Sequence, residues 1–210
     1  MSPARRSSTL SRPSRRTSAP TWWQRALPVV VIVVLMWVSE IFDQITPGSL
    51  DQYGVQPREV DHLGGIVLMP FLHGGYEHLA ANSSALLVLG ALLAWTTRHL
   101  WIVSAGVVLL GGLGVWLTGA PNTVHIGASG LVYGYAAFLA VYGFVARKFA
   151  SALVGILVIV VYGSMVWGVL PTQAGVSWQG HLFGAVAGGV LALWLGRRAR
   201  RRGLNAATFI

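Results

Sequence analysis

The sequence predicts an all-α polytopic membrane protein, a bundle of six transmembrane helices. Hydrophobic residues make up 54% of its 210 residues and charged residues only 10%, which is too apolar for a soluble domain of this size. Six apolar stretches come close to the ~20 residues that a helix needs to cross the hydrocarbon core. Basic residues flank these stretches, a pattern that indicates membrane anchoring and argues against nucleic-acid binding. The length fits one domain with tails.

The first part of the chain is expected to be a disordered basic tail, residues 1–22. It is rich in serine, arginine, proline and threonine and contains no acid. The same composition is also typical of an organellar transit peptide. The membrane domain is expected over residues 23–197, and a second basic tail over residues 198–210. The first helix of the membrane domain is predicted at Leu27–Ile45, with Glu40 and Asp43 where the helix leaves the membrane.

One long connection, residues 46–77, follows the first helix. It contains Pro47-Gly48, Pro57-Arg58 and one apolar run, Leu63–Leu72. That run is too short to span a membrane and fits a re-entrant or interfacial segment. A loop of this length inside a compact domain usually has a function.

Five further spanning helices are predicted after this loop, joined by short links. The last apolar stretch is short by itself, so its helix is expected to begin near Trp178. The five stretches are Leu79–Trp95, Leu100–Thr118, Ile126–Ala146, Ala150–Leu170 and His181–Leu195.

The distribution of charge predicts the orientation of this bundle. Fourteen of the 15 basic residues fall on one side of the predicted membrane, and only Arg58 falls on the other. All six acids lie on that second side or at the adjoining end of the first helix. By the positive-inside rule, both termini are cytoplasmic and the long loop is outside. We therefore expect an integral protein of a bacterial plasma membrane.

Four polar side chains are predicted to lie at one depth near the outer face. Ser129 opens the fourth span, His181 opens the sixth, and His78 and Asn82 share a face of the second span through their i, i+4 spacing. Each can be read as a packing residue or an interfacial anchor. Polar groups within spans are costly, however, and usually mark a function. His62 and His99 lie in links and are expected to have no such role.

These residue types fit nucleophilic catalysis. His181 can act as the general base for Ser129, and no acid lies near it within a span, so the pair would be a dyad. His78 and Asn82, with the backbone N–H of Ser129, can donate to a tetrahedral oxyanion. Tyr133 lies one helical turn after Ser129. It can either stack on the His181 ring and fix its orientation, or have only a packing role.

Small residues are expected to let the fourth and sixth spans pack closely. Gly184 and Gly188 share the face of His181, and Gly130 and Gly134 form the reciprocal face. The link 171–178 between spans five and six contains proline and glycine. It can serve as a lid that moves with Val166–Leu170, or as an ordinary turn.

At these positions the sequence resembles the rhomboid family of intramembrane serine proteases. Gly127-Ala-Ser129-Gly130 matches the family's Gly-x-Ser-Gly. His73-Gly-Gly-Tyr-Glu-His78-Leu-Ala-Ala-Asn82 matches its His-x4-His-x3-Asn, and Gly180-His181-Leu-Phe-Gly184-Ala-Val-Ala-Gly188 its His-x2-Gly-x3-Gly. The resemblance implies a six-helix rhomboid-like core, a water-filled cavity open to the outside, and cleavage of transmembrane substrates near their outer ends. One departure is the first loop, where Pro57-Arg58 stands in place of the family's frequent Trp-Arg.

Two other function classes follow from the same residues. A catalytically inactive rhomboid-like protein would bind membrane clients without cutting them, although such relatives typically lack the serine or the histidine. A small transporter or channel would favour internal repeats or broken helices near the midplane, and the sequence has no repeat. No cofactor or metal is expected, and the chain has no cysteine. The expected partners are transmembrane protein substrates and the lipid bilayer, with the oligomeric state left open.

Overall fold

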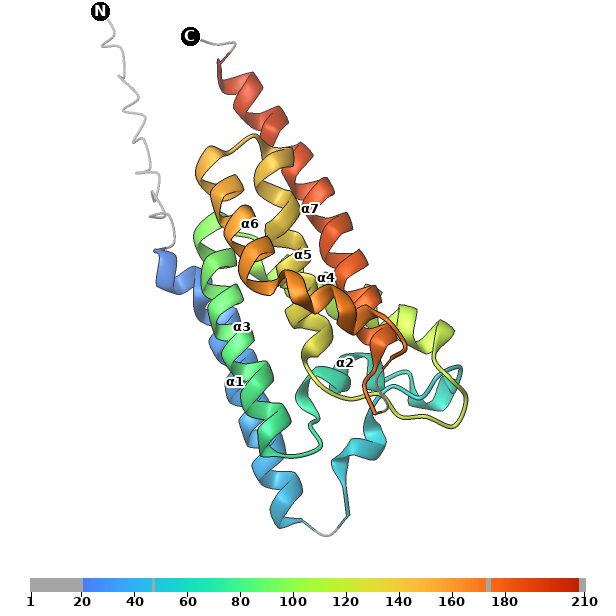
Figure 1. Cartoon of the computed structure of the whole chain (residues 1–210). Coiled ribbons are helices and arrows are strands. Elements are labelled where there is room, and N and C mark those ends of the chain that lie inside the picture. Colours follow the sequence, from blue (N-terminus) through green and yellow to red (C-terminus); the bar gives the residue numbers. More distant parts are fainter. Residues whose placement is uncertain (1–20, 47, 173–174, 208–210) are drawn as a thin grey trace, which may run out of the picture.

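The computed structural model describes residues 21–46, 48–172 and 175–207, with side chains up to residue 204. Among these residues all regular elements are helices, joined by turns and loops, and one isolated β-bridge pairs Val55 with His125. Six helices are long and apolar enough to cross a membrane. Figure 1 shows them packed together as one bundle. The long helical segments are α1 (Trp22–Ile45), α3 (Tyr76–Thr96), α4 (Leu100–Thr118), α5 (Ser129–Ala146), α6 (Phe149–Tyr162) continued by η4 (Gly163–Val169), and α7 (Trp178–Ala207).

The predicted fold class is therefore confirmed, and several helix ends differ from the prediction. α3 begins at Tyr76 and not at Leu79, α5 begins at Ser129 and not at Ile126, and three further ends differ by more. α1 begins at Trp22 because the backbone N–H of Thr21 donates to Gln24 Oε1 at 2.8 Å, so the polar first turn is still capped. The fifth span is α-helical only to Tyr162 and then tightens into the 3-10 segment η4. α7 continues through the arginines after residue 197, good helix formers, into the predicted C-terminal tail. The predicted disorder of residues 1–20 lies outside the described residues.

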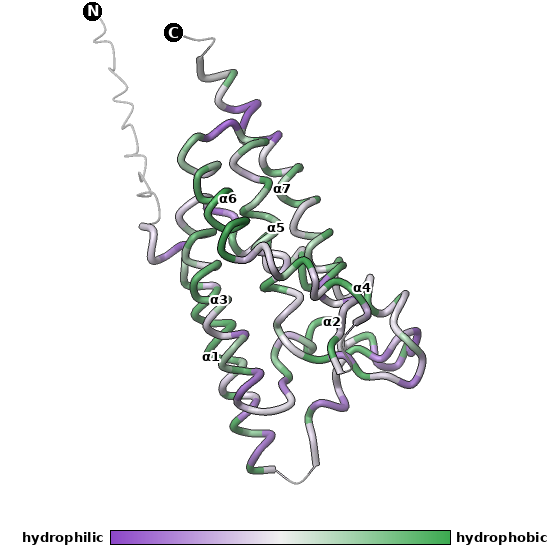
Figure 2. The backbone as a smooth tube through the Cα atoms, viewed as in Figure 1, coloured by the Kyte–Doolittle hydropathy of each residue, from purple (hydrophilic) through white to green (hydrophobic). Residues whose placement is uncertain are grey.

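The outer surface of the bundle is apolar. Large side chains such as Val160 (76% exposed) and Trp167 (69% exposed) point away from the core. Figure 2 shows apolar residues along the helices and polar residues gathered toward the two ends of the bundle. A soluble monomer rarely exposes continuous apolar surface of this kind. The protein is an integral membrane protein.

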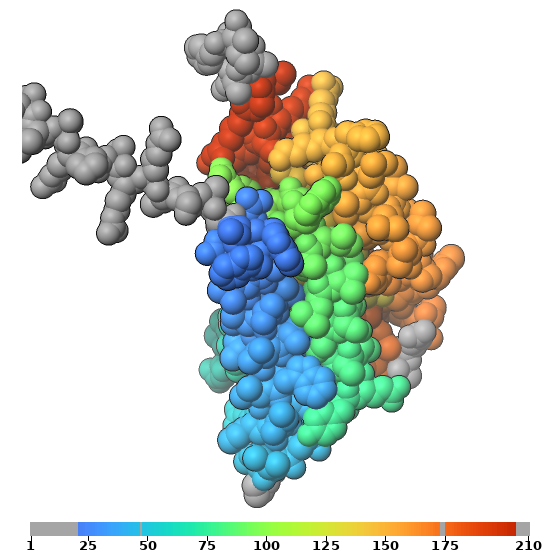
Figure 3. All heavy atoms as spheres, turned by 90° about the vertical axis from the view of Figure 1, so that its left-hand side faces the viewer, coloured from blue at the N-terminus to red at the C-terminus, as the bar shows by residue number. Residues whose placement is uncertain are grey.

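Contact between α5 and α7 is the most extensive of any helix pair. A Cβ added to Gly184 would fall on the carbonyl oxygen of Gly130, and one added to Gly188 would fall on that of Gly134. The two backbones therefore touch, as expected for small residues one turn apart in membrane helices. On another face, visible in Figure 3, α1 and α3 lie side by side.

The long loop is ordered against the outer end of α4. It contains η1 (Leu50–Tyr53), η2 (Val60–His62), α2 (Gly65–Leu68) and η3 (Met69–Phe71). Arg58 Nη1 donates to the carbonyl oxygen of Leu117 at 3.1 Å, and Trp116 Nε1 donates to that of Glu59 at the same distance. The last carbonyl groups of a helix accept no hydrogen bond from within the helix, and Arg58 donates to one of them at the end of α4.

Candidate active site

Ser129 and His181 are brought together at one end of the bundle. Ser129 is the first residue of α5, and His181 lies in the first turn of α7. Ser129 Oγ and His181 Nε2 are 2.9 Å apart, although 52 residues separate them in the sequence. The close contact of Gly130 with Gly184 brings the two helices near enough for this bond. The distance lies within hydrogen-bond reach, as a nucleophile and its base require.

The other nitrogen of the His181 ring is also engaged. His181 Nδ1 lies 2.8 Å from the carbonyl oxygen of Gly168 in η4. A carbonyl can only accept, so Nδ1 carries the hydrogen and Nε2 presents its lone pair to Ser129. Ser129 Oγ–H is then the donor in the Ser129–His181 bond. The backbone of η4 fixes the tautomer that a general base needs, a task that a carboxylate performs in many serine hydrolases.

Tyr133 fixes the plane of the same ring. Its ring stacks on that of His181, with centroids 4.1 Å apart and planes 8° from parallel. Its hydroxyl donates to the carbonyl oxygen of Met165 at 2.9 Å. Because Met165 and Gly168 both belong to η4, this segment holds the histidine and the residue stacked on it.

The segment that precedes Ser129 lies against His78 and Asn82. Gly127 adopts φ = +102°, and a Cβ there would lie 2.7 Å from His78 Cε1 and 3.7 Å from Asn82 Nδ2. Only glycine can therefore combine this backbone conformation with so close an approach. Asn82 is 6% exposed, and its Nδ2 donates to no acceptor among the described residues. A buried amide N–H2 without an acceptor is costly.

His73 also bonds to the segment that precedes Ser129, and no role was assigned to it from the sequence. It is 1% exposed, and its Nε2 accepts the backbone N–H of Ala128 at 3.4 Å. Burial, with a smaller effect of nearby His78, lowers the pKa of His73 from its ordinary 6.5 to about 4. The ring is therefore neutral at physiological pH, as an acceptor must be. Its motif position was visible in the sequence, but its bonding partner was not.

A hydrogen-bonded chain links the loop before α5 to the start of α7, and no motif in the sequence pointed to it. Thr123 Oγ1 donates to Ala120 O at 2.6 Å, so its oxygen must accept from His125 Nε2 at 3.1 Å. His125 Nδ1 is then an acceptor, and Ser177 Oγ donates to it at 2.6 Å. Burial lowers the pKa of His125, which favours the neutral ring that these two hydrogen bonds require.

Ser177 also bonds to the first turn of α7, the helix that contains His181. Its Oγ also accepts the backbone N–H of Gly180 at 3.3 Å, and its carbonyl oxygen accepts the N–H of His181 at 3.2 Å. Ser177 thus caps the first turn of α7. The predicted lid over residues 171–178 includes residues 173 and 174, which lie outside the described residues.

The fold and this site together define a membrane protein of six spanning helices in which a serine and a histidine pair near one end of the bundle. The family model of the rhomboid domain matches residues 61–198. An uncharacterised protein of Mycobacterium tuberculosis is 41% identical over 198 residues, which cover 90% of this chain and 82% of that protein. One of Mycobacterium leprae is 40% identical, over 86% of this chain and 75% of that protein. The chain belongs to the rhomboid family.

A more distant relative carries a functional name. A Bacillus subtilis protein named "Putative rhomboid protease YdcA" is 26% identical over 139 residues. The match covers 62% of this chain and 66% of that protein. This likeness agrees with the family assignment.

Proposed function

We propose that this protein is an intramembrane serine endopeptidase that cuts transmembrane proteins with a Ser129–His181 dyad. The observation that carries the proposal is the pair of bonds made by His181, one to Ser129 Oγ at 2.9 Å and one to the Gly168 carbonyl at 2.8 Å. Together they give the imidazole the tautomer and the direction that a general base requires.

In the acylation step, Ser129 Oγ attacks the scissile carbonyl carbon while its proton passes to His181 Nε2. The resulting imidazolium keeps its Nδ1–H bond to Gly168, and its positive charge lies over the π face of Tyr133. His181 then gives the proton to the leaving amine, and the C–N bond breaks. A water molecule attacks the acyl-enzyme, with His181 as base, and releases the second product.

The negative charge of the tetrahedral intermediate would be met by donors beside Gly127. Asn82 Nδ2, the ring of His78 and the backbone N–H of Ser129 are the candidates. Asn82 supports this role best, because its buried N–H2 has no acceptor among the described residues. A donor held in place before the reaction stabilises the transition state without reorganisation.

The position of the dyad suggests where substrates are cut. Ser129 and His181 lie in the first turns of their helices, close to the loops at the acidic end of the bundle. At most ~10 Å then separates them from the helix ends, at 1.5 Å rise per residue. With both termini in the cytoplasm, as the charge distribution favours, substrates would be cleaved near their outer ends.

The experiment that tests this function is labelling of the purified protein with a serine-reactive fluorophosphonate. We expect wild-type protein to be labelled, Ser129→Ala protein to remain unlabelled, and His181→Ala protein to react far more slowly. Ser84→Ala is the matched control, because Ser84 is an exposed serine whose hydroxyl donates to the carbonyl oxygen of Ala81 in its own helix, α3. A folded wild-type protein that resists the label would favour the inactive, client-binding alternative.

A further inference from the structure

A second site lies at the end of the bundle opposite to the dyad. A cavity of about 510 Å³ opens between the start of α1, the α3–α4 link, the α5–α6 link and the C-terminal part of α7. Lys148 in its wall follows the end of α5, whose first residue is Ser129. The 18 residues of α5 place the two sites roughly 27 Å apart, at 1.5 Å per residue. The volume falls within the range of about 300–1,000 Å³ that is typical of ligand sites.

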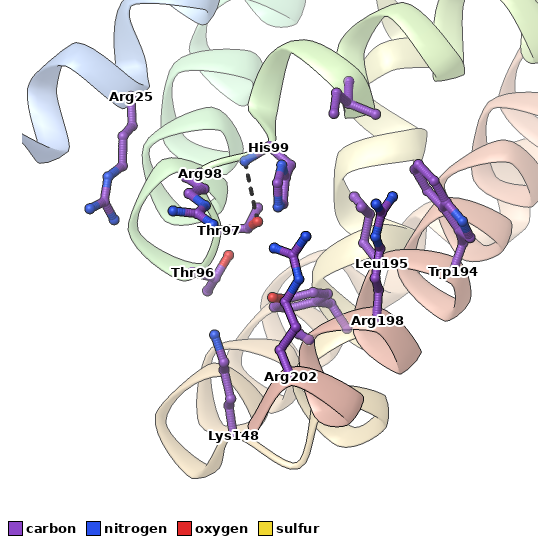
Figure 4. A pocket seen from close by; sticks show the side chains of 13 residues that line it. Arg25, Thr96, Thr97, Arg98, His99, Lys148, Trp194, Leu195, Arg198 and Arg202 are labelled. Atoms are coloured by element: carbon purple, nitrogen blue, oxygen red, sulfur yellow. Dashed lines mark hydrogen bonds between the residues drawn. The ribbon is translucent and has the colours of Figure 1, made fainter. Parts of the chain in front are cut away.

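The wall of this cavity is strongly cationic. Figure 4 shows Arg25, Arg98, Lys148, Arg198 and Arg202, contributed by different parts of the bundle, around one space. No acid lines the cavity, and all six acids of the chain lie between residues 40 and 77. Like charges held close together repel one another, so an anion bound among them would relieve an electrostatic cost.

His99 also belongs to the wall, where it is partly buried among these cations. Burial, followed by the charges of Arg98, Arg202, Arg198 and Lys148, lowers the pKa of His99. Its ring is therefore neutral and adds a hydrogen-bond donor to the wall. The backbone N–H of His99 donates to Thr97 Oγ1 at 3.3 Å, and α4 begins at the next residue, so the positive end of its helix dipole lies beside this wall.

One side of the cavity is apolar and continues onto the lipid-facing surface. Ile102 (43% exposed) and Trp194 (47% exposed) belong to this side. A neighbouring groove of about 490 Å³ runs along α7 past Val190, Leu193 and Arg201, and it shares Trp194 and Arg198 with the cavity. Arg198 lies over the Trp194 ring at 5.6 Å, so a cation and an apolar surface meet where the two spaces join.

We propose that this cavity binds the phosphate headgroup of an anionic phospholipid whose acyl chains lie along the groove on α7. Phosphate is the shared chemistry of a lipid headgroup and a soluble phosphate compound, and guanidinium groups match its geometry. The groove has apolar residues (Val190, Leu193 and Trp194) beside three arginines, and this apolar surface favours the lipid because a soluble phosphate compound has no acyl chains to place on it. Several converging cations suit a headgroup with two phosphates, such as that of cardiolipin, better than a singly charged one.

The test measures lipid binding to the full chain in neutral detergent by native mass spectrometry, with cardiolipin, phosphatidylglycerol and phosphatidylcholine as probes. We expect apparent affinity in that order. Arg98→Gln/Arg202→Gln should weaken cardiolipin binding by on the order of 10-fold or more, since each basic residue contributes appreciably to binding of anionic lipid. Arg98→Lys/Arg202→Lys should recover most of the affinity.

The matched control is Arg147→Gln/Arg200→Gln, which removes the same charge from exposed residues outside both spaces. It should bind cardiolipin nearly as wild type does, and a thermal midpoint without lipid checks the folding of every variant. Equal losses in the two pairs, or equal affinity for phosphatidylcholine, would overturn the proposal. Inorganic diphosphate forms the second arm. Binding of diphosphate as tight as that of cardiolipin, with the same sensitivity to Arg98 and Arg202, would assign the site to a soluble phosphate compound and refute the lipid.

Discussion

His181 Nδ1 lies 2.8 Å from the carbonyl oxygen of Gly168, so a backbone group orients the ring whose other nitrogen faces Ser129. Gly168 belongs to η4, the 3-10 continuation of the fifth span. The same segment accepts the hydroxyl of Tyr133 through Met165. The outer end of the fifth span is thereby connected to His181 directly through Gly168 and indirectly through Tyr133, and an outward movement of this end would release His181.

Gly168→Ala tests this connection. A Cβ at position 168 would fall on the hydroxyl of Tyr133 and lie 3.2 Å from His181 Nδ1. We expect the rate of fluorophosphonate labelling at Ser129 to fall by about 10-fold or more, as for other losses of preorganisation. The matched control is Gly163→Ala in the same segment, where an added Cβ meets nothing within 4 Å. Equal effects of the two substitutions on labelling would refute the positioning role of Gly168.

Asn82→Ala should lower turnover with little effect on folding. Removal of one oxyanion donor costs on the order of 10²- to 10³-fold in kcat. Because Asn82 Nδ2 makes no hydrogen bond with the described residues, its removal should leave the thermal midpoint nearly unchanged or raised. The measurement compares kcat and the midpoint with those of Ser84→Ala on the same helix. A variant with wild-type kcat would show that Asn82 serves only packing, and the same experiment applies to His78.

Ser177→Ala should weaken both the start of α7 and the reaction. It removes the acceptor for the Gly180 N–H and the donor to His125 Nδ1. Loss of a serine cap costs about 1 kcal/mol of stability. We expect a lower thermal midpoint and a several-fold lower kcat, with KM changed little. Ser177→Thr keeps both bonds and should restore activity, whereas Ser177→Asp keeps only the cap and separates the two contributions. An unaffected kcat in Ser177→Ala would contradict the role in placing His181.

Buried His73 should make the protein sensitive to acid. Its pKa is about 4 in the folded protein and near 6.5 when the chain is unfolded, so the unfolded state binds the proton more readily. This contribution to stability is complete above about pH 6.5 and is lost as the pH falls toward 4. Thermal midpoints measured between these two values should decline with falling pH, and less steeply in His73→Gln. An equal decline in both proteins would show that other groups cause it.

Much of this architecture could be predicted because membrane helices are specified by long apolar runs. Close contact between the α5 and α7 faces followed from the four-residue spacing of glycines, since only small residues let two backbones touch. The change from α6 to η4 was not predictable, because the residues after Tyr162 remain apolar while the backbone changes its hydrogen bonding. The burial of Glu40 was not predictable either: it lies in the last turns of α1, as expected, and is 1% exposed and accepts from Gln44 at 2.9 Å.

The side chains of the candidate site could be predicted from the sequence, but most of the groups that bond to them could not. Ser129, His181, His78 and Asn82 are unusual residues for apolar helices, and their depth follows from helix geometry. The acceptor for His181 is a main-chain carbonyl, which no residue type identifies. His125 and Ser177 belong to links of ordinary composition, and only the tertiary structure brings them together.

The most direct measurement of the central claim is cleavage of a model transmembrane substrate by protein reconstituted in liposomes. Four proteins are compared: wild type, Ser129→Ala, His181→Ala and the double variant. If the two residues act as one catalytic unit, each single substitution reduces cleavage to background and the double variant is no worse. A folded Ser129→Ala protein that still cuts the substrate at an appreciable rate would contradict the account.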